Sequence, residues 1–510
     1  MKIKKVLFGS LVAAMMAGGL AGCGGESGTK LTLWVSESAG VAELTKQQVK
    51  DFNNSDMAKE AGIKVSATIE KVSESNAATQ MLNDVSAGAD IFCFAQDQFA
   101  RLVQGGALSK LATSVAAEVT KENAPGAVAA VTSGDTLYAY PMTADNGYFL
   151  YYDKSVLSET DVTNMETLLT KLESAKKNIS FEMESSAWYL ASYFFATGCK
   201  SEWKTDDEGK FISVTDTFDS ANGLISVRAM QRLVQSSSYV SSSAASDLSA
   251  ATPSAALVSG TWAYNDVLSV LGDNMGVAEL PYFTVDGKDY HLGSFSGYKL
   301  MGVKPQTTSE KAKAAQLLAQ YLTSEKCQIE RFNKVAWGPS NLKAQQNEAV
   351  LANPALVALN KQNQYATVQG QIHGSWWDIA KVIGTGVKNA KAGDTAALQK
   401  VLDDYKDSIE SLFNMSEDEL NAWTVIGSFA SLKAEDGEWT VDYEMEEATD
   451  GVWTLKDAIT LAEGDEFKIR QGKSWDVAFP ASNYVVSASE AGSAKIQLVE
   501  ATGAVSIIAA

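Results

Sequence analysis

The stretch LTLWV at residues 31–35 decides the fold, because this short apolar run is typical of a buried β-strand. Beyond a polar turn, apolar residues at helical spacing predict an amphipathic helix over residues 41–52. A second strand is expected at residues 63–65. Strand, helix and strand in this order are typical of a parallel βαβ unit, so we expect an α/β protein.

The same alternation continues toward the C-terminus. A further strand is predicted at residues 89–94, where apolar residues again run together. Helical spacing of apolar residues predicts helices at 78–86, 220–234, 311–322, 379–390 and 395–412. We therefore expect the α/β body to occupy residues 31–413.

The sequence changes character near residues 414–421. Helical spacing ends there, and seven short β-rich runs follow, separated by Gly, Asp and Asn. Seven short strands in fewer than a hundred residues predict an all-β, immunoglobulin-like sandwich over 421–510.

The N-terminus has the pattern of an export signal. Three lysines precede an apolar run at 6–19, which is too short for a membrane-spanning helix. The ending LAGC at 20–23 resembles the lipobox of bacterial lipoproteins, which implies a signal peptide at 1–22 and a lipid on Cys23. Residues 23–30 then form a tether, and the protein faces outward at the cell membrane. The alternative is an ordinary cleaved signal followed by an unmodified cysteine.

Composition excludes several classes of function. The net charge is −20 over 510 residues, and −23 without residues 1–22, which disfavours nucleic acid as a partner. His291 and His373 are the only histidines, and neither lies in a zinc-protease motif. No Gly-x-Ser-x-Gly motif is present either, which disfavours a Ser-His-Asp triad, and we expect no metal or cofactor. Cys93, Cys199 and Cys327 lack metal-ligand spacing, and buried free thiols are the simplest expectation.

Several motifs in the body resemble the extracellular solute-binding proteins of ABC importers, in the family that binds oligosaccharides. The matching stretches, in the family's order, are LTLW at 31–34, ADIFCFAQD at 89–97, GDTLYAYP at 134–141, LYYDK at 150–154 and ALVSGTW at 256–262. The resemblance implies two α/β lobes that close around a ligand about a hinge. Lobe 1 would comprise 31–143 and 290–338, and lobe 2 would comprise 144–289 and 339–413. Crossings between the lobes would lie near 141–144, 287–295 and 337–341.

A sugar presents apolar C–H faces, which stack on aromatic rings, and hydroxyl groups, which need directional hydrogen bonds. The positions that match the family's binding aromatics are Phe94, Trp188, Trp262, Trp376 and Trp377. Adjacent residues point in different directions, so we expect one member of the pair Trp376 and Trp377 to face a cleft.

Polar contacts are expected from four side chains. Asp97 matches a family carboxylate, and Glu37 lies in the first strand–helix loop. Asp145 follows the first lobe crossing, but the spacing there differs from the family by one residue, so Asn146 is an alternative.

The C-terminal region resembles the β-sandwich modules of secreted starch-binding lipoproteins, through WTVIG at 423–427, GVWT at 451–454 and GDEFKIR at 464–470. Trp475 and Asp476 are the candidates for a second sugar site there. A role as a spacer is the alternative, because the family's asparagine after this pair is missing.

The predicted function is a monomeric, membrane-anchored receptor that delivers malto-oligosaccharides to an ABC permease. Three alternatives stay open at this point: a receptor for another oligosaccharide, a surface polysaccharide-binding protein without import, and a glycoside hydrolase that uses Asp97 and Asp145.

Overall fold

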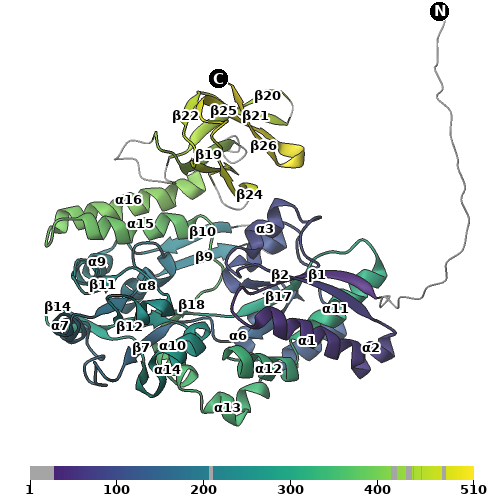
Figure 1. Ribbon diagram of the computed structural model, residues 1–510, viewed down its shortest axis with the longest axis horizontal. Helices are drawn as coiled ribbons and strands as arrows, with labels where there is room; N and C mark the ends of the chain where they lie inside the picture. Colours follow the sequence, from purple (N-terminus) through teal and green to yellow (C-terminus); the bar gives the residue numbers. More distant parts are fainter. Residues whose placement is uncertain are drawn as a thin grey trace, which may run out of the picture.

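Figure 1 shows the computed structural model of the protein. The structure describes residues 28–205, 211–414, 422–431, 439, 441–449, 451–473 and 478–509. The predicted signal peptide, Cys23, Trp475 and Asp476 lie outside the described residues. Among the residues that are described, no helix is both long and apolar enough to cross a lipid bilayer.

Lobe 1 is built on a five-stranded sheet of order β2-β1-β3-β17-β6. Its strands are β1 (Thr29–Val35), β2 (Val65–Lys71), β3 (Ile91–Ala95), β6 (Ala139–Thr143) and β17 (Lys299–Val303). β1 pairs in parallel with both β2 and β3, and α1 (Val41–Asn54) connects β1 toward β2, which confirms the predicted βαβ unit. Apolar cores lie on both faces of this sheet.

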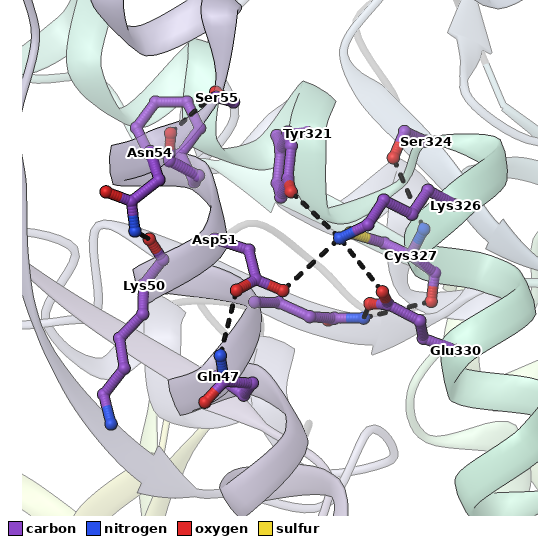
Figure 2. Close-up of polar contacts among 12 residues, drawn as sticks. Gln47, Lys50, Asp51, Asn54, Ser55, Tyr321, Ser324, Lys326, Cys327 and Glu330 are labelled. Atoms are coloured by element: carbon purple, nitrogen blue, oxygen red, sulfur yellow. Dashed lines mark hydrogen bonds and ion pairs between the residues drawn. The ribbon is translucent and has the colours of Figure 1, made fainter.

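The outer helices of lobe 1 are joined by polar contacts around Lys326, shown in Figure 2. Its ammonium group, on α12 (Glu325–Val335), lies 3.3 Å from a carboxylate oxygen of Asp51 on α1 and 3.0 Å from one of Glu330. It also donates to the hydroxyl of Tyr321 on α11 (Ser309–Leu322). The pKa of Lys326 rises above its usual range, mainly through the hydrogen bond to Glu330. Because Lys326 is mostly exposed, these contacts add little stability and chiefly set how the helices meet.

Lobe 2 is built on a second five-stranded sheet, of order β11-β8-β12-β7-β13. Its strands are β7 (Phe149–Asp153), β8 (Asn178–Ser180), β11 (Tyr239–Val240), β12 (Ser254–Ser259) and β13 (Met275–Ala278). Its helices include α8 (Ala187–Ala196), α9 (Ala221–Val234), α15 (Trp376–Asn389) and α16 (Thr395–Asn414). The last three were predicted from their apolar spacing.

Three chain segments cross between the lobes and hydrogen-bond to one another. Ala144 N donates to the carbonyl of Gly338, and Asn146 N donates to the carbonyl of Gly297. The second crossing was predicted near 287–295, and this placement is wrong. Gly287, with φ of 77°, turns a hairpin between β14 (Tyr282–Val285) and β15 (Lys288–His291), and the chain crosses later, between β16 (Ser294–Ser296) and β17.

The C-terminal module is all β, as predicted. Its strands follow the order β22-β25-β21-β20-β19-β23-β24, with β26 beside β25. The bounds are β19 (Trp423–Ser428), β20 (Tyr443–Thr449), β21 (Val452–Leu455), β22 (Ile459–Leu461), β23 (Glu466–Gln471), β24 (Ala478–Val485), β25 (Gly492–Val499) and β26 (Ala504–Ala509). The start of β20 pairs with β19 and its remainder pairs with β21, so the sheet folds over one shared apolar core. Among the described strands, β22 matches no predicted run, and β24 overlaps its predicted run only at Tyr484 and Val485.

Cys93, Cys199 and Cys327 are buried free thiols, which confirms the expectation from their spacing. Burial raises the pKa of Cys93 to about 12, so this thiol stays protonated at neutral pH.

Candidate ligand-binding cleft

A cavity of about 1150 Å³ lies where the two lobes meet. On the lobe 1 side it is lined by residues from three segments: 36–38 after β1, 73–80 after β2, and 95–101 after β3. These strands are parallel, so the segments emerge at one edge of the sheet, the edge where open α/β sheets bind ligands. Lobe 1 therefore presents a mainly polar wall.

Lobe 2 presents an aromatic wall. Trp188 lies in α8, which follows β8, and Trp262 lies in the short helix η3 (Thr261–Ala263), which follows β12. β8 and β12 are parallel, so both tryptophans lie at one edge of the second sheet. Their ring centroids are 5.8 Å apart, and Trp377 of α15 lines the same cavity. All three indoles are half-buried.

The two adjacent tryptophans take different environments. Trp376 is fully buried, and its indole N–H donates to the hydroxyl of Tyr405 at 2.9 Å. Trp377, the next residue of the same helix, lines the cavity instead. Successive helix residues are rotated by about 100°, which turns one indole into the core and the other into the cleft.

A chain of hydrogen bonds joins the two walls through Gln369. Its side-chain nitrogen donates to Asp97 Oδ1 at 2.7 Å. Its side-chain oxygen accepts from Asn146 Nδ2 at 3.1 Å and from Trp188 Nε1 at 3.2 Å. Gln369 thus connects a carboxylate of lobe 1 with an indole of lobe 2.

Asp97 is the buried acid of the cleft. Desolvation raises its pKa to about 6, although Arg101 and hydrogen bonds from Trp377 and Gln369 act in the opposite direction. At neutral pH the side chain is therefore ionised and accepts hydrogen bonds.

Lys299 and Trp337 are among the cavity residues that were not predicted from the sequence. Lys299, the first residue of β17, places its ammonium group 3.8 Å from the ring centroid of Trp337 and 5.2 Å from that of Trp262. Both distances fit cation–π contacts. Lys299 and Trp337 come from the return crossings, far from the motifs in sequence, so no local pattern pointed to them.

The predicted ligand-binding residues divide into two sets. Those that line the cavity are Glu37, Asp97, Asn146, Trp188, Trp262 and Trp377. Those that lie outside it are Phe94, Asp145 and Trp376.

The placement of Phe94 and Asp145 argues against the ligand contacts predicted for them. Phe94 packs in the apolar core of lobe 1 and is fully buried. Asp145 is buried in the hinge, where one carboxylate oxygen accepts from Thr261 Oγ1 at 2.5 Å and from Gly338 N at 2.6 Å. Of the two alternatives after the first crossing, only Asn146 reaches the cleft.

The cleft combines aromatic faces with carboxylate and amide groups. Flat apolar surfaces on one wall and hydrogen-bonding groups on the other suit a ligand that has both C–H faces and hydroxyl groups.

Comparison with known proteins gives the same architecture. A family model described as "Bacterial extracellular solute-binding protein" matches residues 47–358. A structure solved "with acarbose" is 28% identical, with a TM-score of 0.64, and covers 76% of this chain and 100% of its own. The maltodextrin binding protein MalE1 from L. casei BL23, without ligand, is 23% identical (TM-score 0.63; 75% and 99% covered). The GacH receptor of Streptomyces glaucescens GLA.O is 19% identical (TM-score 0.62; 77% and 100% covered).

Proposed function

The chain belongs to the family of bacterial extracellular solute-binding proteins, and from this premise we propose that it is the carbohydrate receptor of an ABC importer. Its proposed cargo is a malto-oligosaccharide. The observation that carries the proposal is the pairing of an aromatic wall on lobe 2 with a polar wall on lobe 1 around one cavity. The solved neighbour at 28% identity, which contains acarbose, supports the choice of ligand class.

The proposed mechanism is capture followed by closure. Sugar rings stack on Trp188, Trp262 and Trp377, and closure about the hinge brings Asp97 and Asn146 to the hydroxyl groups. A ligand shifts the open–closed equilibrium only through its greater affinity for the closed state. Contacts made by both walls at once supply that difference. The closed receptor, as a monomer, then docks on the membrane subunits of the permease.

The lipid proposed on Cys23 keeps the receptor beside its permease. This anchor restricts the search for the permease to two dimensions. The tether predicted over 23–30 ends earlier than expected, because Thr29 and Lys30 belong to β1.

Binding without catalysis is the role we propose for the cleft. Glycoside hydrolysis requires two carboxyl groups on either side of the scissile bond. Asp97 lines the cavity, but Asp145, the second candidate in the sequence, is held by hydrogen bonds inside the hinge. The buried Asp97 is therefore assigned to ligand positioning.

Tryptophan fluorescence tests the proposal directly, because five tryptophans line the cleft: Trp188, Trp262, Trp337, Trp377 and Trp439. Residues 30–510 are titrated with maltose through maltoheptaose, and with the β-linked cello-oligosaccharides as the matched control. We expect a saturable change at micromolar α-glucan, about −8 kcal/mol, and none with the control series. A folded protein that responds to no α-glucan contradicts this cargo, and new reducing ends in the mixture contradict the non-enzymatic role.

A further inference from the structure

The C-terminal module forms part of the cleft itself. Trp439, Lys468 and Asn483 line the same cavity as the tryptophans of lobe 2 and the polar loops of lobe 1. These three residues lie in the segment before β20, in β23 and in β24. The cavity therefore has a third wall, in addition to the two that the hinge brings together.

Strand alternation explains why Lys468 faces the cleft. Its neighbours Phe467 and Ile469 enter the core of the module, and successive side chains on a strand point to opposite faces. Asn483 lies on the adjacent strand, where its side-chain amide donates to Glu466 at 2.8 Å. The backbone N–H of Trp439 donates to the carbonyl of Gly427 at 2.9 Å, so the residue is held at the end of β19.

The module is attached to lobe 1 beside the cleft. β24 lies against α3 (Ala77–Asn83), and the backbone N–H of Ala478 donates to Asn83 Oδ1 at 3.2 Å. Figure 1 shows the yellow module above the body, with β24 close to α3. The loop that leads into α3 supplies residues 73–76 of the polar wall. α3 therefore contacts the module, and the loop that precedes α3 contributes to the polar wall of lobe 1.

The chemistry of the third wall matches that of the other two. Trp439 is a half-buried indole, Asn483 carries an amide, and Lys468 is a half-buried ammonium donor. Burial lowers the pKa of Lys468, which is consistent with a position between the module and the body. The solved neighbours are matched over nearly their whole length by about three quarters of this chain. The remaining quarter is about as long as the leader and the module together.

We propose that the module supplies an additional sugar subsite, in which Trp439 stacks on one ring and Lys468 and Asn483 hydrogen-bond to its hydroxyl groups. The inference rests on the proposed function, because it assumes that the cleft binds an oligosaccharide. Rings at one end of the chain lie against Trp188, Trp262 and Trp377, and rings at the other end reach the module. The receptor therefore prefers long oligosaccharides, and affinity rises with chain length.

Isothermal titration of the full chain tests this assignment with Trp439→Ala and the matched control Trp453→Ala. Trp453 is also a half-buried indole of the module, but it lies outside the cavity and donates to Glu500 at 2.9 Å. We expect Trp439→Ala to weaken maltoheptaose binding at least about tenfold, while maltose binding changes less than about twofold. Trp453→Ala should leave both affinities unchanged.

A second variant, Lys468→Gln, covers the case in which Trp439→Ala does not fold, as judged by circular dichroism. It should also weaken maltoheptaose more than maltose, because the ammonium donor is lost. If both variants bind every chain length as the wild type does, the additional subsite is refuted while the receptor assignment stands. Equal losses for maltose and maltoheptaose also refute it. A wild type that binds neither sugar contradicts the proposed function itself.

Discussion

The two lobes share an architecture but present different proportions of aromatic and polar side chains to the cleft. On lobe 1, the cavity is lined by short polar segments at 36–38, 73–80 and 95–101. On lobe 2, three indoles line it beside fewer polar side chains than lobe 1 contributes, among them Asn146 and Gln369. Most of the aromatic faces lie on lobe 2, whereas most of the side chains that can hydrogen-bond to hydroxyl groups lie on lobe 1. A sugar contacts both walls only when the hinge brings them together. The difference between the walls therefore couples ligand binding to closure.

The contrast has a simple origin in the helices. Trp188, Trp262 and Trp377 are each the second residue of a helix. Side chains in a helix tilt toward its N-terminus, so an aromatic residue in the first turn projects beyond the helix end. On lobe 1 the loops themselves reach the cleft, and their small polar residues leave room for the ligand.

The largest effect is expected where the walls are joined, at Asp145. Asp145→Ala removes the oxygen that accepts from Thr261 Oγ1 and Gly338 N, and leaves two buried donors without a partner. We expect a loss of about 3 kcal/mol in the free energy of unfolding. Denaturant titration followed by circular dichroism measures it.

Asp153→Ala is the matched control, because Asp153 Oδ1 also accepts from one backbone N–H and one hydroxyl, both of Ser155, but in an exposed turn. Its cost should stay below about 1 kcal/mol, since water replaces the lost partner. If the two variants lose equal stability, the hydrogen bonds of Asp145 do not stabilise the hinge more than those of an exposed turn. If Asp145→Ala is as stable as the wild type and loses only ligand affinity, Asp145 contacts the ligand, as predicted from the sequence.

The aromatic wall is tested by Trp377→Ala, with Trp203→Ala as a control on the same lobe. Trp203 is half-buried on the hairpin strand β9 (Ser201–Thr205) and does not line the cavity. Loss of the Trp377 ring should weaken α-glucan binding by about 2 kcal/mol, roughly thirtyfold. Calorimetry that finds the same affinity for both variants would remove Trp377 from the site.

Much of this organisation could be predicted because it is local in sequence. The apolar spacing at 41–52 and the run at 31–35 define a helix and a strand without reference to the rest of the chain. Trp188, Trp262 and Trp377 were also identified, through motifs and through the argument that two adjacent indoles diverge. These three tryptophans could be predicted because each lies in a short stretch with a recognisable pattern.

Residues that depend on tertiary packing were not predictable in the same way. β3 is buried on both faces, so alternation does not reveal which way Phe94 points. Gln369 and Lys299 reach the cleft only because distant segments meet at the hinge. Trp439 reaches it only because the module lies against α3.

The polar wall is tested by Asp97→Asn. The amide keeps an oxygen for Gln369 but loses the charge that strengthens hydrogen bonds from hydroxyl groups. We expect about tenfold weaker α-glucan binding at neutral pH, about 1.4 kcal/mol. Wild-type affinity should fall as the pH drops through about 6, where Asp97 takes up a proton. The affinity of the variant should be flat over the same interval, and a parallel decline in both proteins would assign the pH dependence to another group.

The same variant should be more stable than the wild type in alkaline solution. Between the ordinary pKa of 3.8 and about 6, the folded protein binds more protons at Asp97 than the unfolded chain does. Stability therefore falls as the pH rises through this window, and stays lower above it. Thermal unfolding should show a higher Tm for Asp97→Asn at about pH 8, and a gap that narrows toward pH 4. A constant gap would mean that desolvation of the carboxylate is not its cause.

The smallest effect is expected at Glu37, which is exposed at the rim of the polar wall. Glu37→Gln keeps the shape and the oxygen while removing a charge that water already solvates, so α-glucan affinity should change by less than about twofold. Calorimetry at low and high salt separates a long-range effect of the charge from a direct contact with the sugar, because salt screens only the long-range effect. A tenfold loss that persists in high salt would show that Glu37 contacts the sugar in the closed state. The polar wall that contacts the ligand would then extend to the rim of the cleft.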